Sequence, residues 1–364
     1  MKTVIWCLSG AEQHGINEVE ELIGKKATIL RPGRLVIENT TEQETADLTV
    51  YGRTFLRTGE FLGQGNAKTI DEIKVEIQKL KLNITGTFAV RSERKGEQEF
   101  TSQELEREIG DKIGNIIQQK VDLENPDKAI LIDMDNDSWI LILDWCGKPL
   151  SKRDYRIQIN NSAINPCFAA VLLREAGWTT KESLLDFFTR TGEVPIEAAL
   201  KAINKSPFYE SIENFAFQKF FSYKTKQKEK ETTAEIFAVD SLQNNLRNAE
   251  INAKLAGVQK VVTFRRIEMD WMDIKFGEAS VDVIITVPPA PSNQFPENKA
   301  KKLYKDVFYQ VKYILKNKGR VIVAIPKKEA FVEEAIKEGF KVEKEIKVTS
   351  GNREYSVLTL KKAI

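Results

Sequence analysis

The chain has 364 residues, and its 55 lysines and arginines nearly balance its 53 aspartates and glutamates, giving a formal net charge of +2. At roughly 100–200 residues per domain, this length predicts two or three domains. The near-balanced charge excludes a protein that holds nucleic acid by bulk charge alone, although it allows a local basic face. No apolar run approaches the ~18 residues of a membrane helix, and the apolar stretch at the start is too short for a secretory signal. We therefore expect a cytoplasmic protein without a membrane partner.

The cysteines and the histidine exclude several kinds of site. Cys7, Cys146 and Cys167 are far apart and form no CxxC pair, so we expect neither a disulfide framework nor a metal site. The single histidine, His14, excludes His-dependent catalytic triads and HExxH zinc sites. His14 lies in a polar stretch, where we expect a solvated residue at a helix start.

The first 145 residues predict alternating strands and helices. Helical spacing marks 17–24, 69–82 and 100–120, with Thr69 as an N-cap and a capping-box-like start at Thr101. Branched and aromatic residues predict strands over 1–8, 27–39 (two strands around a Pro-Gly turn), 86–96 and 128–147 (two strands around Asp135-Asn136-Asp137). The stretch 46–63 fits either a helix or a helix followed by a strand.

From residue 183 onward the predicted elements alternate strictly. A helix at 164–178 with Pro166 in its first turn leads into strands at 183–188, 235–240, 261–267, 281–287 and 319–326, with helices at 194–203, 244–257, 299–315 and 327–339. Such alternation requires a parallel sheet with right-handed crossovers. The last two strands, 341–350 and 354–362, leave no room for a helix, so they add an antiparallel strand. This ending is typical of class I S-adenosylmethionine (SAM) methyltransferases rather than of a plain dinucleotide-binding fold.

Several motifs in this order resemble the THUMP-domain tRNA guanine-N2 methyltransferases over nearly the whole chain. They are TFAVRSERKGEQEFTSQELEREIGDKI, the linker GKPLSKRDYR, the SAM-loop segment LLDFFTRTGEVPIEAAL, and FAVD with NAEINAKLAG. The resemblance implies an α/β protein with an N-terminal ferredoxin-like domain (1–60), a THUMP domain (61–145), a linker with a lead-in helix (146–182) and a Rossmann-like class I methyltransferase domain with a seven-stranded, mostly parallel sheet (183–364). It also implies SAM as cofactor and tRNA, held by its acceptor end, as partner. We expect a monomer.

The cofactor site is expected where parallel strands end and strand order reverses. By the resemblance, Asp186, Gly192 and Asp240 match SAM-site positions, with Asp240 accepting from the ribose hydroxyls, and Asp270 lies near the position that faces the adenine. An aspartate that caps the next helix is the alternative for each acid. Arg190 stands where the family has the first glycine of its SAM loop, and adds bulk and positive charge near the expected sulfonium. Its side chain can swing outward or pair with the methionine carboxylate.

The fourth strand ends in Val287-Pro288-Pro289-Ala290, where the family has Asn or Asp, x, Pro and an aromatic residue. The family's acid or amide accepts a hydrogen from the guanine amine, whose lone pair is otherwise delocalised. Val287 cannot accept one, and losing a positioned partner of this kind costs on the order of 10²–10³ in rate. Ala290 forfeits most of the stacking on a flipped base, worth ~1–3 kcal/mol. A simple strand terminator is the alternative role of the two prolines.

Basic residues in two segments form the predicted RNA-binding surface. They are Arg91, Arg94 and Lys95 on the THUMP strand and Lys148, Lys152, Arg153 and Arg156 in the linker. The stretch 215–231 interleaves five lysines with aromatic residues and is also typical of RNA binding, but a buried aromatic strand followed by a solvated loop explains it as well.

Two functions remain open from the sequence. One is SAM-dependent methylation of guanine N2 in tRNA; the other is a degenerate homologue that binds tRNA or a protein without methyl transfer. The three exchanged positions, Arg190, Val287 and Ala290, all fall at the expected chemistry. An NAD-linked oxidoreductase is disfavoured by the terminal hairpin and the missing GxGxxG.

Overall fold

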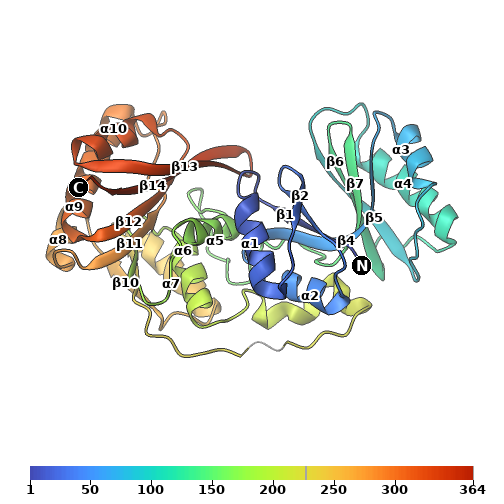
Figure 1. Cartoon of the computed structure of the whole chain (residues 1–364), viewed down its shortest axis with the longest axis horizontal. Helices are drawn as coiled ribbons and strands as arrows, with labels where there is room; N and C mark the ends of the chain where they lie inside the picture. The colour runs from blue at the N-terminus through green and yellow to red at the C-terminus, as the bar shows by residue number, and fades with distance from the viewer. Residues whose placement is uncertain (226–227, 364) are drawn as a thin grey trace. The chain divides into compact units, whose positions relative to one another are not determined.

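A computed structural model describes residues 1–225 and 228–363. The chain divides into two compact units, which we describe separately (Figure 1). Unit 1 comprises residues 1–6, 19–150 and 211–225, and unit 2 comprises residues 7–18, 151–210 and 226–364. Among the described residues, no helix combines the length and the apolar character needed to cross a membrane.

Unit 1 is built on a seven-stranded sheet in the order β2-β3-β1-β4-β7-β6-β5. Its strands are β1 (Thr3–Cys7), β2 (Thr28–Arg31), β3 (Arg34–Ile37), β4 (Phe55–Asn66), β5 (Phe88–Lys95), β6 (Lys128–Asp135) and β7 (Ser138–Asp144). The long strand β4 lies between β1 and β7 and so joins the two halves of this sheet. The expected boundary between residues 60 and 61 falls inside β4, so the two expected parts, 1–60 and 61–145, share one continuous sheet.

Four helices accompany these strands. They are α1 (Glu12–Ile23), α2 (Glu42–Tyr51), α3 (Ile70–Ile77) and α4 (Ser102–Ile117). Thr69 is an N-cap and Thr101 closes a capping box with Glu104, as predicted; Thr69 also closes a capping box with Glu72. The stretch 46–63, which fits two alternatives by sequence, ends α2 and then forms β4, because Gly52 stops the helix. Residues on α3, α4 and the strands β5–β7 form one apolar core.

The single histidine lies inside α1 and is paired. His14 Nε2 lies 2.9 Å from Glu175 Oε2, and the two side chains are only 14% and 2% exposed. The expectation of a solvated histidine is therefore wrong, because the contact with Glu175 covers the ring.

A segment from the second half of the chain completes unit 1. Residues 211–225 contribute to two short 3₁₀ helices, η1 (Tyr209–Asn214) and η2 (Ala216–Lys219). The Phe217 amide donates to the Trp145 carbonyl at 3.1 Å, and their rings lie 5.5 Å apart. The alternative prediction of an aromatic strand here is wrong, because the segment forms short 3₁₀ helices. Its aromatic rings are buried by packing on Trp145. Lys226 of the predicted lysine run lies outside the described residues.

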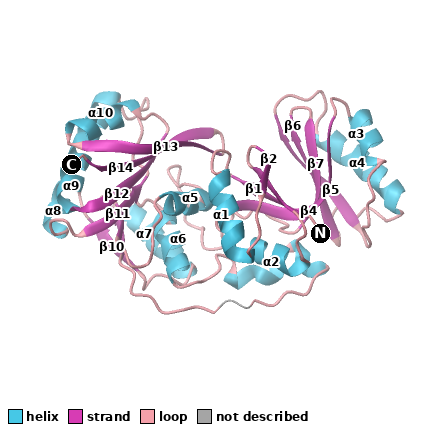
Figure 2. Cartoon of the chain, in the orientation of Figure 1, coloured by secondary structure: helices cyan, strands magenta, loops and turns pink. Residues whose placement is uncertain are grey.

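Unit 2 has a seven-stranded sheet in the order β10-β9-β8-β11-β12-β14-β13 (Figure 2). Its strands are β8 (Leu184–Asp186), β9 (Ile236–Asp240), β10 (Val262–Arg266), β11 (Val281–Thr286), β12 (Leu315–Ile325), β13 (Phe340–Ser350) and β14 (Arg353–Lys362). The first five pair in parallel, and β14 runs antiparallel to both β12 and β13. The predicted mostly parallel sheet with a terminal hairpin is confirmed.

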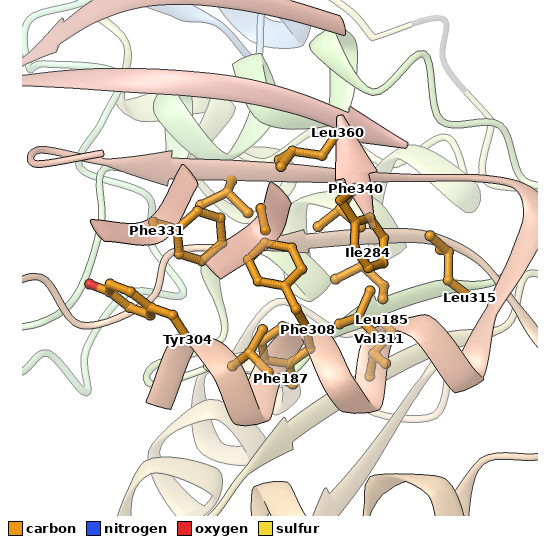
Figure 3. Packing of buried hydrophobic residues seen from close by; sticks show 14 of the residues in the cluster. Leu185, Phe187, Ile284, Tyr304, Phe308, Val311, Leu315, Phe331, Phe340 and Leu360 are labelled. Atoms are coloured by element: carbon orange, nitrogen blue, oxygen red, sulfur yellow. The ribbon is translucent and has the colours of Figure 1, made fainter. Parts of the chain in front are cut away.

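Helices on both faces cover this sheet. They are α5 (Pro166–Glu175), α6 (Glu193–Ala202), α7 (Gln243–Leu255), η3 (Met269–Trp271), α8 (Met272–Lys275), α9 (Glu297–Ile314) and α10 (Glu329–Lys337). Figure 3 shows the core on the side of α9, where Phe308 packs against Phe331 and Phe340 with ring centroids 4.8 and 5.0 Å apart. This apolar layer fixes the strands whose carboxyl ends carry the expected site.

Candidate functional site

Three neighbouring strands of unit 2 end in polar side chains. Asp186 is the last residue of β8, Asp240 of β9 and Thr286 of β11. The Thr286 hydroxyl donates to Asp186 Oδ1 at 2.9 Å, and the Phe188 amide donates to the same oxygen at 3.2 Å. Asp186 thus faces the carboxyl edge of the sheet, where open α/β folds bind their ligands.

Asp240 already has donors on both carboxylate oxygens. Its Oδ1 accepts from the Leu242 amide at 3.0 Å, and its Oδ2 accepts from the Arg190 amide at 3.0 Å. The Asn245 side-chain nitrogen lies 3.1 Å from both oxygens. A carboxylate has about four lone-pair positions, so ribose hydroxyls would have to replace at least one of these donors.

Arg190 occupies the space beside these acids. Its backbone is left-handed (φ 51°), the conformation for which glycine is favoured. Its guanidinium donates to the Ser162 carbonyl at 3.1 Å and to the Val287 carbonyl. The cavity that remains between Asp186, Arg190 and Val287 measures about 10 Å³, which is room for about one water molecule.

Burial shapes the charges in this site. It raises the pKa of Asp186 to about 7, against the hydrogen bonds from Thr286 and Phe188. It also lowers the pKa of Arg190, although Asp186 and Glu193 lie near enough to favour the charged guanidinium. The hydroxyl of Thr189, which lines the same cavity, is buried and has no hydrogen-bond partner among the described residues. The loop therefore holds a partly buried cation next to one unsatisfied hydroxyl.

The residues at the expected catalytic position are engaged within the fold. Val287 is buried, and its carbonyl is taken by Arg190. The Tyr304 hydroxyl donates to the Pro289 carbonyl at 2.6 Å, and burial raises the pKa of Tyr304 to about 12. Ala290 packs against the apolar core. The two prolines follow the end of β11 at Thr286, a position that agrees with the alternative role of terminating the strand.

Gly192 and Asp270 differ in their relation to this site. Gly192 precedes the first residue of α6 with φ 89°, and a Cβ there would approach Ala249 Cβ to 3.0 Å. It therefore serves the close packing of α6 on α7. Asp270 lies on η3, where its charge acts on Asp306, and it is not among the residues that line the cavity beside Arg190.

Two arginines of the linker make ion pairs with α6 in unit 2. Arg153 is fully buried, with its Nε 3.1 Å from Glu197 Oε1, and the Tyr155 hydroxyl donates to the same oxygen at 2.9 Å. Arg156 pairs with Glu193 at 3.3 Å. Arg153 and Arg156 thus hold the linker on α6. The full burial of Arg153 contradicts its predicted role as an RNA-binding residue, whereas the Arg156 side chain is 20% exposed and Lys152 is exposed.

Unit 1 contains a basic cavity of about 500 Å³. Its lining includes Arg57, Arg91, Lys148 and Lys219, against two carboxylates, Asp127 and Asp144. Asp144 Oδ2 lies 2.5 Å from the Arg57 guanidinium. Two of the other cations donate to neutral oxygens: Arg91 to the Leu123 carbonyl, and Lys219 to the Asn125 side chain and the Pro126 carbonyl.

Two of the predicted RNA-binding residues, Arg91 and Lys148, therefore line this cavity. Arg94 and Lys95 lie at the end of β5, where the Arg94 guanidinium is 5.6 Å from the Phe100 ring and Lys95 is 3.9 Å from Asp135. They are not among the residues that line the cavity.

Sequence reasoning missed several partners in both places. The missed partners at the site are Asn245, which donates to Asp240, the Ser162 carbonyl, which accepts from Arg190, and Tyr304, which donates to the Pro289 carbonyl. In unit 1, the missed residues are Arg57 and Lys219, which also line the basic cavity. Lys219 belongs to the lysine-rich stretch already noted, so a signal existed. The others lie in ordinary helices, strands and loops, where residue type alone gives no signal. No group of three or more potential metal ligands is found within the described residues.

Comparison with known proteins decides the family. Residues 153–356, more than half of the chain, match the model described as "RMKL-like, methyltransferase domain", and residues 67–144 match the THUMP domain. The chain belongs to the RMKL-like methyltransferase family. It is 28% identical to the tRNA (guanine(6)-N2)-methyltransferase of Methanocaldococcus jannaschii, over 94% of this chain and 95% of that protein. It is 26% identical to the protein of the same name from Archaeoglobus fulgidus, over 91% and 84%.

Solved structures support the same fold. One described as SMU.472, a putative methyltransferase complexed with SAH, matches with a TM-score of 0.82 and 18% identity over 99% of this chain and 98% of that one. TrmN from Thermus thermophilus matches with a TM-score of 0.74 and 22% identity over 99% of each chain. The predicted order, a THUMP-containing α/β part followed by a class I methyltransferase domain, is confirmed.

The expectation of SAM as cofactor is confirmed for the family, but the residues of this chain do not fit it in the conformation described. Small-molecule sites usually measure about 300–1,000 Å³, whereas about 10 Å³ remains beside Arg190. Asp240, the expected ribose acceptor, is occupied by Asn245 and two backbone amides. The pocket therefore has to rearrange before it can hold SAM.

Proposed function

We propose that this chain is a tRNA-binding member of the methyltransferase family, and that its inherited reaction is SAM-dependent methylation of guanine N2 in tRNA. The observation that carries the proposal is the similarity to the Methanocaldococcus protein, which extends over 94% of the chain and so includes both units. A THUMP domain together with a class I methyltransferase domain is the pair of domains expected of a tRNA-modifying enzyme.

The basic cavity of unit 1 supports tRNA as the partner. Its four cations outnumber its two carboxylates, and Arg91 is exposed at its edge. Phosphate oxygens can displace the neutral acceptors of Arg91 and Lys219, because a hydrogen bond with charge on both partners is stronger. Counterions released from the RNA would then add to the free energy of binding.

A filter-binding or fluorescence titration with tRNA over a range of salt concentrations tests this proposal. We expect affinity to fall steeply with salt, and Arg91→Ala combined with Lys219→Ala to reduce the slope by about one for each phosphate that no longer pairs with the protein. Lys79→Ala combined with Lys81→Ala is the matched control, because both lysines belong to unit 1 and lie outside the cavity. Salt-insensitive binding, or equal effects of the two pairs, would contradict the proposal.

The loop of Arg190 favours a second candidate function, tRNA binding without methyl transfer. Arg190 fills the cofactor position, Val287 offers no side-chain acceptor, and Ala290 offers no ring for a flipped base. Incubation of purified protein with SAM and unmodified tRNA, followed by mass spectrometry of the nucleosides, separates the two functions. N2-methylguanosine formed in stoichiometric excess over protein supports the enzyme; tRNA binding without it supports the second candidate.

A further inference from the structure

The loop after β8 places a cation of the protein where the cationic cofactor is expected. SAM carries a sulfonium, and the Arg190 guanidinium lies among Asp186, Glu193 and Asp240, whose charges all act on it. Two cations in one partly buried site repel each other and compete for the same acids. Arg190 and SAM therefore exclude each other both by volume and by charge.

The hydrogen bonds of Arg190 are of a kind that a ligand can replace. Its guanidinium donates to two backbone carbonyls, those of Ser162 and Val287. Arg153, by contrast, lies fully buried against the carboxylate of Glu197. Hydrogen bonds to neutral acceptors contribute less than those to charged ones, and the guanidinium also bears a burial penalty, which lowers its pKa. Withdrawal of Arg190 into solvent relieves that penalty.

The wall of the cavity keeps groups that a ligand can use. The Thr189 hydroxyl is buried without a partner among the described residues, and leaving a buried hydroxyl unpaired is unfavourable. Both donors to the Asp186 side chain within the described part of the chain reach Oδ1, so Oδ2 stays available to a ligand. A buried polar atom without a partner needs a physical explanation, and a ligand that binds there supplies one.

We propose that Arg190 is an internal competitor of SAM: its side chain closes the cofactor pocket, and SAM binds only by displacing it. This inference rests on the proposed function for the identity of the cofactor, but it concerns a residue that stands where the resemblance implies a glycine. Binding of SAM to the chain is consequently weak, and Arg190 determines how weak it is.

Isothermal titration of SAM and of S-adenosylhomocysteine into the full chain tests the proposal. Arg190→Gly is expected to bind SAM at least about tenfold more tightly, and glycine suits the left-handed backbone at this position. The gain is expected to be larger for SAM than for S-adenosylhomocysteine, because only SAM carries the sulfonium charge. Equal gains for the two molecules would overturn the competition by charge.

Ala279→Gly is the control, because Ala279 is also left-handed (φ 48°) in unit 2 and does not line the pocket. Arg190→Asn, which also tolerates this backbone, replaces Arg190→Gly if that variant folds poorly. The proposal is overturned if the unaltered chain binds SAM as tightly as Arg190→Gly, or if SAM binds neither Arg190→Gly nor Arg190→Gly with Asn245→Ala. The tRNA titration on the same samples tests the proposed function separately, since it does not use this pocket.

Discussion

The side-chain nitrogen of Asn245 lies 3.1 Å from both carboxylate oxygens of Asp240. Asn245 thus occupies the carboxylate that is expected to accept from the cofactor ribose. We expect Asn245→Ala to raise SAM affinity a further several-fold in the Arg190→Gly background, and to change it little in the unaltered chain, where Arg190 still fills the pocket. Isothermal titration measures both. Asn244→Ala, an exposed neighbour on α7, is expected to have no effect.

Methyl transfer by the unaltered chain is expected to be slow or undetectable. Val287 supplies no acceptor for the guanine amine, a loss of about 10²–10³ in rate, and Ala290 supplies no stacking surface. Restoring Val287→Asn and Ala290→Tyr in the Arg190→Gly background is expected to raise the rate of label transfer from SAM to tRNA above that of Arg190→Gly alone. Rapid transfer by the unaltered chain would show that another acceptor near Pro289 replaces the family's side chain.

The buried pair Arg153–Glu197 is expected to act on stability rather than on RNA. Removing one partner leaves an uncompensated buried charge, so Arg153→Ala is expected to lower the free energy of unfolding by about 3–5 kcal/mol. Lys152→Ala, the exposed neighbour, is expected to change it by less than about 0.5 kcal/mol. Thermal unfolding measures the difference. If the two variants were equally stable and tRNA binding by Arg153→Ala depended less on salt, Arg153 would have to be regarded as an RNA-binding residue.

Asp186 predicts a pH dependence of stability. Burial raises its pKa to about 7, from 3.8 for a solvated aspartate. Between these values the folded state keeps a proton that the unfolded state releases, so the free energy of unfolding falls as the pH rises from about 4 to about 7. Each unit of pKa difference corresponds to about 1.4 kcal/mol.

The variant Asp186→Asn checks this pH dependence. Its amide oxygen still accepts from Thr286 and Phe188, but the side chain carries no charge at any pH. Relative to the unaltered chain, we expect Asp186→Asn to gain stability at pH 8 over pH 5, as measured by thermal unfolding at both values. A difference that is the same at pH 5 and pH 8 would mean that Asp186 titrates normally.

Local patterns in the sequence predicted most of the fold, because each left a physical signature. Threonine before a helical pattern predicted the N-cap at Thr69, and threonine followed three residues later by glutamate predicted the capping box at Thr101. Strict alternation after residue 183, with two final strands too close for a helix, predicted the mostly parallel second sheet and its terminal hairpin. The aromatic run at 215–221 was less predictable, because its packing on Trp145 joins residues about 70 positions apart.

For the candidate site, the sequence proposed residues but not their geometry. The resemblance pointed to Asp186, Arg190 and Asp240, yet it left open whether Arg190 turns outward or pairs with the methionine carboxylate. That choice depends on the carbonyls of Ser162 and Val287, which are backbone atoms and leave no mark in residue type. Burial of Arg153 likewise depends on Glu197, 44 residues away, so charge alone placed Arg153 incorrectly on the surface.

The order in which unit 1 is completed has a consequence for synthesis on the ribosome. Its last segment, residues 211–225, is made only after the first strand of the other sheet, and it covers Trp145 with Phe217 and Phe220. Until then the nascent chain exposes the aromatic face that this segment later covers. A fragment ending at residue 150 would keep that face uncovered and is expected to aggregate, whereas adding residues 211–225 as a separate peptide is expected to restore its solubility.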